Sequence, residues 1–167
     1  MCEQKQTPPV KVEVKNLTKK FGDLLVLDNI SFDVYQGDLL CVVGPTGCGK
    51  TTFLNSLTKI YDITSGQILL DGKPVDPKTN NIAYIFQGDS TMPWLTVEQN
   101  VAFGLDIKHV PKARRDELVA KYLDIVGLTK YKSYYPKQLS SSMLQRVSIA
   151  RALSLIHISE PTRLRCI

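Results

Sequence analysis

The sequence predicts an α/β fold in which a strand-rich first part is followed by a helical insertion. Strand patterns dominate up to Gln87, and helical periodicity dominates from Thr96 to Leu153. In the first part, a glycine-rich loop joins a continuous apolar run to an amphipathic segment, the order expected of a buried strand, a turn and a helix. With 167 residues, 43% of them hydrophobic, the chain has enough apolar content for one core.

Half-buried and turn-linked strands are expected at three places. VKVEVKNL (residues 10–17) alternates apolar and polar residues, and VLDNISFDV (26–34) is a second strand that ends at the turn YQGD (35–38). GQILLDGKPV (66–75) has the pattern of two short strands joined by an Asp-Gly turn.

Two apolar runs predict more deeply buried strands. LLCVVG (39–44) is short, continuous and apolar, as expected of a strand covered on both faces of a parallel sheet. NIAYIF (81–86) is a second buried strand that ends at Gln87.

Four segments have helical spacing. KTTFLNSLTKI (50–60) is amphipathic, and TVEQNVAFGL (96–105) follows a change of period at Thr96. The segment 111–128 is opened by Pro111, a residue favoured at the start of a helix. LSSSMLQRVSIARAL (139–153) predicts a polar turn followed by a helix.

Composition excludes several classes of protein. No apolar run approaches the ~20 residues that span a bilayer, and the first residues lack the apolar stretch of a secretory signal, so a cytoplasmic location is expected. The four cysteines (Cys2, Cys41, Cys48, Cys166) have no metal-binding or CxxC spacing, which predicts reduced thiols. The net charge of +5 comes from scattered basic residues, which favours a solvated surface over nucleic-acid binding.

The segment GPTGCGKTT matches the spacing G-x-x-x-x-G-K-[ST] between a predicted strand and a predicted helix. Its glycines allow successive backbone N–H groups to face phosphate oxygens, the lysine reaches the β- and γ-phosphates, and the first threonine ligates Mg²⁺. The alternative, a chance glycine-rich turn, leaves the strand, lysine and threonine context unexplained. The predicted nucleotide-binding residues are Gly44, Pro45, Thr46, Gly47, Cys48, Gly49, Lys50, Thr51 and Thr52.

Cys48 lies inside this loop, so reagents that modify thiols are expected to interfere with nucleotide binding. The alternative is a small residue that only fits the loop.

Two longer stretches narrow the choice among nucleotide-binding proteins. YIFQGDSTMPWLTVEQNVAFGL and YPKQLSSSMLQRVSIARAL resemble the ATP-binding subunits of ABC transporters, and the resemblance covers nearly all of residues 10–153. It is nearest to the importer branch for nitrate, sulfonate, taurine and similar compounds. The resemblance implies a P-loop NTPase core, with an incomplete parallel sheet and an antiparallel β subdomain, and a helical insertion. It implies a flexible tail at 1–9, an α/β core at 10–87, a helical subdomain at 88–138 and a signature turn and helix at 139–153.

The resemblance also implies roles for single residues. Phe21 matches the aromatic residue that stacks on adenine, and Gln87 matches the glutamine that senses the γ-phosphate and Mg²⁺. Residues 93–103 match the region that docks on the membrane subunits, where Trp94 is either an exposed anchor or a core residue.

The signature turn departs from the family pattern, since LSSSM stands where relatives have LSGGM or LSGGQ. Ser140 is kept, whereas Ser141 and Ser142 replace glycines. If these positions had positive φ, the serines would add strain of about 1–2 kcal/mol each. Ser140 and Ser142 are the predicted contacts to the phosphates of ATP bound by the partner subunit, and weaker dimer closure is expected.

The function implied by the resemblance is that of an ATPase which powers an importer. ATP and Mg²⁺ would be the cofactors, and the partners a second copy, a membrane-spanning subunit and, indirectly, a solute-binding protein. The location would be cytoplasmic, peripheral on the inner face of the membrane. Two alternatives stay open: a non-hydrolysing nucleotide-binding fragment, and a relative acting in DNA repair or translation, against which the docking stretch argues.

The last residues do not fit this pattern. LSLIHISEPTR, from Leu153 to Arg163, resembles the translation of a transposon-based sequencing adapter at every position. SEPT resembles the DEPT of the family's catalytic site, but Ser159 stands where Mg²⁺ needs an aspartate, so Glu160 is not expected to be the base. His157 comes too early for the family's switch histidine. We therefore expect residues 154–167 to be artefactual, the natural protein to be longer, and this chain to show no ATP turnover.

Overall fold

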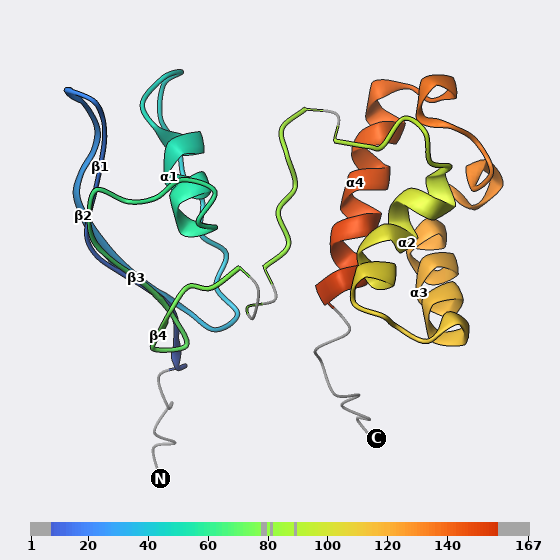
Figure 1. Ribbon diagram of the computed structural model, residues 1–167, viewed down its shortest axis with the longest axis horizontal. Coiled ribbons are helices and arrows are strands. Elements are labelled where there is room, and N and C mark those ends of the chain that lie inside the picture. The colour runs from blue at the N-terminus through green and yellow to red at the C-terminus, as the bar shows by residue number, and fades with distance from the viewer. Residues whose placement is uncertain (1–7, 78–79, 81, 89, 157–167) are drawn as a thin grey trace, which may run out of the picture. The chain divides into compact units, whose positions relative to one another are not determined.

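The computed structural model in Figure 1 describes residues 8–77, 80, 82–88 and 90–156. It has two compact units, Met1–Asn80 and Asn81–Ile167. Residues 82–87, which the sequence analysis assigns to the α/β core, group with the second unit.

An antiparallel sheet forms the first unit. Its strands are β1 (Val10–Phe21), β2 (Leu24–Tyr35), β3 (Ser65–Leu70) and β4 (Lys73–Pro74), in the order β2-β1-β3-β4. The expected strands at 10–17, 26–34 and 66–75 are confirmed, and β1 and β2 are longer than the patterns indicated. Gly66, the second residue of β3, has φ +94°, and an added Cβ there would clash with the Asn16 carbonyl oxygen, so only glycine lets β3 approach β1 this closely.

Helix α1 (Lys50–Leu57) packs on this sheet and confirms the helix expected from residue 50. Phe53 is buried, and its ring lies 5.6 Å from that of Phe32 on β2. Around this pair the core of the unit contains Val14, Leu17, Leu27, Ile68 and Val75. Burial of these side chains holds the helix, and with it the loop that precedes the helix, on the sheet.

The two strands expected at 39–44 and 81–86 are not formed, and this corrects the sequence analysis. Residues 39–44 and the described residues 82–86 have no strand assignment, and every pairing among the described residues is antiparallel. Leu39 is 95% exposed and Val43 is 84% exposed. A parallel strand needs a neighbouring strand to bond with and cover on both faces, and neither segment has such a neighbour in the described part of the chain.

Three helices make up the second unit: α2 (Val97–Ile107), α3 (Lys112–Ile125) and α4 (Ser141–Ile156) (Figure 1). Two short 3₁₀ helices, η1 (Thr129–Tyr131) and η2 (Pro136–Gln138), connect α3 to α4. The three helices confirm the sequence-based expectations. Their shared core contains Val97, Val101, Leu105, Leu118, Val119, Tyr122, Leu123, Leu128, Val147 and Ala150.

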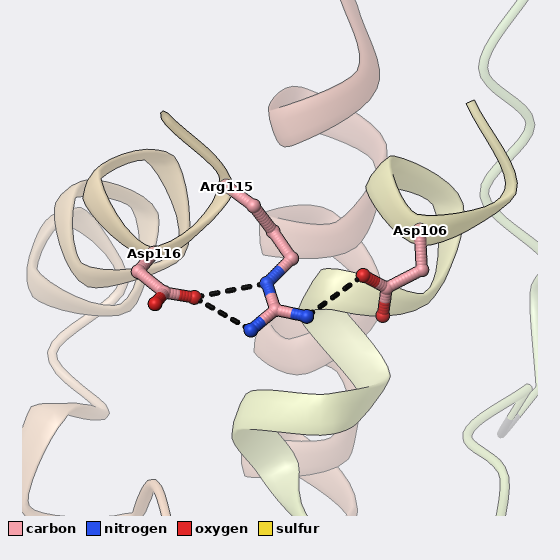
Figure 2. Close-up of polar contacts among 3 residues, drawn as sticks. All are labelled: Asp106, Arg115 and Asp116. Atoms are coloured by element: carbon pink, nitrogen blue, oxygen red, sulfur yellow. Dashed lines mark hydrogen bonds and ion pairs between the residues drawn. The ribbon is translucent and has the colours of Figure 1, made fainter. Parts of the chain in front are cut away.

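Caps and surface ion pairs mark the helix ends. Thr96 and Gln99 form a reciprocal capping box at the start of α2. Near its end, Asp106 accepts a 2.9 Å hydrogen bond from Arg115 of α3, and Arg115 also contacts Asp116 at 2.8 Å (Figure 2). The hydrogen bonds to Asp106 and then Asp116 raise the pKa of Arg115. Because the group is solvated, this contact orients α2 and α3 more than it stabilises them.

Helix α4 extends past Leu153, where the sequence analysis ends the domain, to Ile156. The Ser154 side chain is fully buried and donates to the carbonyl oxygens of Arg151 at 2.8 Å and Val101 at 3.3 Å. His157, Ser159 and Glu160, on which the sequence analysis based its expectation of no turnover, lie outside the described residues. No helix in the described ranges is long and apolar enough to cross a membrane.

The exposed segment 39–43 predicts self-association, because it combines apolar side chains with backbone N–H and C=O groups that no strand pairs, and such a segment can pair with another chain. We expect oligomers whose fraction rises with concentration in sedimentation velocity, and no cooperative thermal transition. Leu39→Lys should lower the oligomer fraction several-fold. Leu24→Lys, at another exposed leucine in the β1–β2 hairpin, adds the same charge and serves as the control. A wild-type chain that is monomeric at every concentration and unfolds in one cooperative transition would contradict this expectation.

Candidate nucleotide-binding site

The phosphate loop is an irregular segment that leads directly into α1. Gly49 caps the helix at φ +97°, and its carbonyl oxygen accepts the first helical hydrogen bond, from the Phe53 N–H at 2.8 Å. A Cβ on Gly49 would lie 3.1 Å from Val26 Cγ1 and 3.2 Å from Leu27 Cδ2 of β2. The loop is therefore pressed against the sheet at a position that only glycine fills without strain.

Lys50 lies across the mouth of this loop. Its Nζ donates to the carbonyl oxygens of Gly44 at 2.7 Å and Pro45 at 2.6 Å, and lies 3.7 Å from Cys48 Sγ. The ammonium group is thus centred on the loop whose spacing predicted a phosphate site. A phosphate oxygen carries formal charge and is a stronger acceptor than a carbonyl, so an anion bound there would compete for the same donor.

The threonines that follow Lys50 occupy the first turn of α1. Thr51 is exposed and Thr52 is half-buried. Mg²⁺ bound to a nucleotide keeps most of its ligands as water and phosphate oxygens, so a single exposed hydroxyl such as that of Thr51 suits it. No cluster of three or more His, Cys, Asp or Glu side chains that could hold a metal lies within the described ranges.

Phe21, the predicted adenine contact, lies at the end of β1 in the same unit as the loop. Its ring is 44% exposed and makes an edge-to-face contact with Tyr61, with centroids 5.6 Å apart and planes at 87°. The ammonium of Lys19 lies over the Phe21 ring, 4.6 Å from its centroid. The sequence analysis missed Tyr61 and Lys19, because neither belongs to a motif and only folding brings Tyr61 beside Phe21.

An apolar hollow of about 400 Å³ lies beside the loop. It is lined by residues of β2, the segment 40–43, the loop and α1, among them Leu27, Phe32, Cys41, Cys48 and Phe53. Cys41 and Cys48 are free and exposed thiols.

The signature residues lie at the start of α4, in the second unit. Ser140 Oγ accepts a hydrogen bond from the Met143 N–H at 3.4 Å and lies 3.1 Å from Ser142 Oγ. Ser141 and Ser142 belong to the helix and neither has positive φ. The condition for backbone strain at these two serines is therefore not met.

Gln87 and Trp94 also belong to the second unit. Gln87 is exposed at a bend in the chain, and its contact with Mg²⁺ stays a prediction. Trp94 is 71% exposed, which decides between the two alternatives in favour of an exposed residue.

A buried amide that sequence reasoning missed organises the turn around Trp94. Asn100 is 0% exposed; its Oδ1 accepts from the Met92 N–H at 2.8 Å, and its Nδ2 donates to the carbonyl oxygens of Met92 and Leu95, each at 3.1 Å. These bonds fix the backbone on both sides of Trp94.

Lys50→Ala should weaken ATP binding by about 10- to 100-fold, because it removes a charged donor to the phosphates. Titration calorimetry with ATP measures the effect. The matched control is Lys73→Ala, at an exposed lysine of β4, which should leave the affinity unchanged. Equal losses in both variants would show that charge in general, and not this site, attracts the nucleotide.

Alkylation of Cys48 should block ATP binding, since its sulfur lies 3.7 Å from Lys50 Nζ, and bound ATP should slow the reaction. N-ethylmaleimide labelling followed by mass spectrometry locates the modified thiol. Cys48→Ser should bind ATP after treatment, whereas Cys41→Ser should remain sensitive. Inhibition that persists in Cys48→Ser would move the sensitive thiol to another position.

Comparisons with known proteins show which family this chain resembles. A family model described as ABC transporter matches residues 27–157. An uncharacterised ABC transporter ATP-binding protein of Methanocaldococcus jannaschii is 45% identical over 149 residues, which cover 87% of this chain and 56% of that relative. An aliphatic sulfonates import ATP-binding protein of Bacillus thuringiensis is 38% identical over 88% of this chain and 59% of its own length. The chain thus spans a little over half the length of these curated relatives.

Among solved structures, the dimeric ATP-binding cassette MJ0796, in a post-hydrolysis state bound to ADP and Pi, matches with a TM-score of 0.78. It is 29% identical, and the match covers 87% of this chain and 70% of that one. The P-loop NTPase fold expected from the sequence is therefore confirmed. Since a family model matches most of its length, the chain belongs to the ABC transporter family.

Proposed function

We propose that the chain is the ATP-binding part of an importer subunit, which uses ATP binding and hydrolysis to drive a membrane-spanning partner. The observation that carries this proposal is the position of Lys50, whose ammonium is centred on the glycine-rich loop at the start of α1. Family membership supports the coupling to transport.

Each predicted residue has a distinct task in this proposal. Lys50 and the loop N–H groups bind the β- and γ-phosphates, Thr51 supplies one ligand to Mg²⁺, and the Phe21 ring stacks on adenine. Mg²⁺ would neutralise charge on the phosphates. Gln87 would sense the γ-phosphate and its metal.

A second copy of the chain would complete the site head to tail. Ser140 and Ser142 would face the γ-phosphate held by the partner's loop, with helical N–H groups and hydroxyls as donors. The Cβ atoms that Ser141 and Ser142 add, where the family pattern has glycines, would keep the backbone further from the phosphate than glycine would. We therefore infer weaker dimer closure than in relatives with LSGG.

The second unit offers a surface for the membrane partner. Trp94 projects from a turn fixed by Asn100, and a hollow of about 380 Å³ in the same unit is lined by apolar side chains that include Phe86, Met92 and Phe103. Exposed aromatic residues and apolar hollows are both features of protein interfaces. Docking there would place the protein at the cytoplasmic face of the membrane.

The transported compound is proposed to be a small anion of the nitrate, sulfonate or taurine type, delivered by a solute-binding protein. Support comes from the stretch PWLTVEQNV, which resembles that branch, and from the relative named for aliphatic sulfonate import. In this proposal the nucleotide site does not contact the transported solute, and the membrane-spanning and solute-binding subunits would determine which solute is transported.

Co-purification tests the proposal. The full-length gene product, expressed with a multi-spanning membrane subunit encoded beside it, should be retained in detergent and hydrolyse ATP with Mg²⁺, whereas the 167-residue chain should not hydrolyse ATP. Trp94→Ala should lower retention about 10-fold, since a tryptophan that becomes buried when a partner binds is a frequent hot spot of protein interfaces. Ile125→Ala removes an apolar side chain of similar exposure at the end of α3 and should have no effect. Full retention of Trp94→Ala would remove this surface from the proposal, and ATP binding without any membrane partner would favour a relative that acts outside transport.

A further inference from the structure

A three-residue aromatic and cationic cluster surrounds Phe21. The Tyr61 ring contacts the Phe21 ring edge to face at 5.6 Å, and Lys19 Nζ lies 4.6 Å from the Phe21 centroid and 6.0 Å from that of Tyr61. These distances are within the ranges at which aromatic pairs and cation–π contacts are attractive. Phe21 remains 44% exposed and Tyr61 39% exposed, so the cluster is not a closed core and leaves ring surface for a planar ligand.

Tyr61 is held from two sides. Its N–H donates to the Asn55 carbonyl oxygen of α1 at 3.1 Å, and the Lys19 ammonium donates to the next carbonyl oxygen, that of Asp62, at 2.5 Å. Three residues later, the Thr64 N–H donates to the Thr18 carbonyl oxygen of β1 at 2.9 Å. The turn that carries Tyr61 is thus tied both to the helix that begins at the phosphate loop and to the strand that carries Phe21.

Phe21 lies at the very end of its strand. It is the last residue of β1, beside the hairpin turn at Gly22, where strand pairing ends. Lys19 lies two positions earlier, and alternate residues of a strand share a face, which explains why its ammonium reaches the Phe21 ring. An exposed ring at a strand end samples several rotamers unless its neighbours restrict it.

We propose that Tyr61 and Lys19 are positioning residues for nucleotide binding, which hold the Phe21 ring in the orientation that stacks on the base. This inference rests on the proposed function, in which Phe21 contacts adenine. Preorganisation of the ring lowers the entropy lost when the base binds. Because α1 connects the phosphate loop to the Tyr61 turn, one helix supports both ends of the nucleotide site.

The cluster of Phe21, Tyr61 and Lys19, here called the base platform, offers exposed ring surface on which a base could stack. Stacking is tolerant of base identity, since every base has a π-face. Changes at Tyr61 should therefore alter the affinities for ATP and GTP by the same factor, and should spare a ligand without a base.

The test compares ATP, GTP and inorganic triphosphate, each titrated with Mg²⁺ into the monomeric fraction of the 167-residue chain. Tyr61→Ala should weaken ATP and GTP binding about 3- to 10-fold, the range expected from an aromatic pair, and change triphosphate binding less than about twofold. Tyr61→Phe keeps the ring and should bind like wild type. Lys19→Met should weaken both nucleotides in the same direction.

A double-mutant cycle shows whether Tyr61 affects nucleotide affinity through Phe21. If Tyr61 acts through Phe21, then Tyr61→Ala should cause no further loss in a Phe21→Ala background. Independent, multiplying losses would overturn the proposal, as would a Tyr61→Ala variant that loses triphosphate and ATP affinity equally, which would indicate a purely structural role. A wild-type chain that binds triphosphate as tightly as ATP and GTP would refute the role of Phe21, Tyr61 and Lys19 in base binding, but not the phosphate site. Failure to bind either ligand would refute the proposed function together with the platform.

Discussion

The packing of α1 on the antiparallel sheet is the contact on which the nucleotide site depends. Phe53 is buried against Phe32 and the core of the first unit, and this burial fixes an eight-residue helix that would not be stable alone. The phosphate loop lies at one end of that helix and the Tyr61 turn follows the other. Loss of the Phe53 contact would therefore displace both the loop and the base platform.

In the second unit, a buried polar group has the corresponding role. Asn100 is fully enclosed, yet both ends of its amide are hydrogen-bonded to the backbone around Trp94, so no desolvation penalty is left uncompensated. An apolar residue of the same size would fill the space but remove the acceptor of the Met92 N–H and the amide donor to the Leu95 carbonyl oxygen. The backbone that carries the exposed tryptophan is thus held by a residue that is itself fully buried.

The apolar segment at 39–43 illustrates the opposite situation. Its composition favours a buried strand, yet Leu39 and Val43 are almost fully exposed because strand pairing is a non-local interaction. Hydrophobicity specifies that a segment prefers burial, but it does not supply the neighbour that buries it. The hollow beside the phosphate loop is lined by this segment, β2 and Phe53, so the apolar side chains on one side of the segment face a space that no other element fills.

The sequence by itself determined the features whose causes are local. The spacing of Gly44–Thr52 placed the phosphate loop and alternation placed β1. The change of period at Thr96 and the proline at position 111 located the starts of α2 and α3 within a residue. Only the tertiary structure decided that Tyr61 contacts Phe21, that Asn100 is buried, and that α4 continues to a buried Ser154. Each of these depends on residues about 40 or more positions apart, or on the burial of one face, and neither pattern nor propensity carries that information.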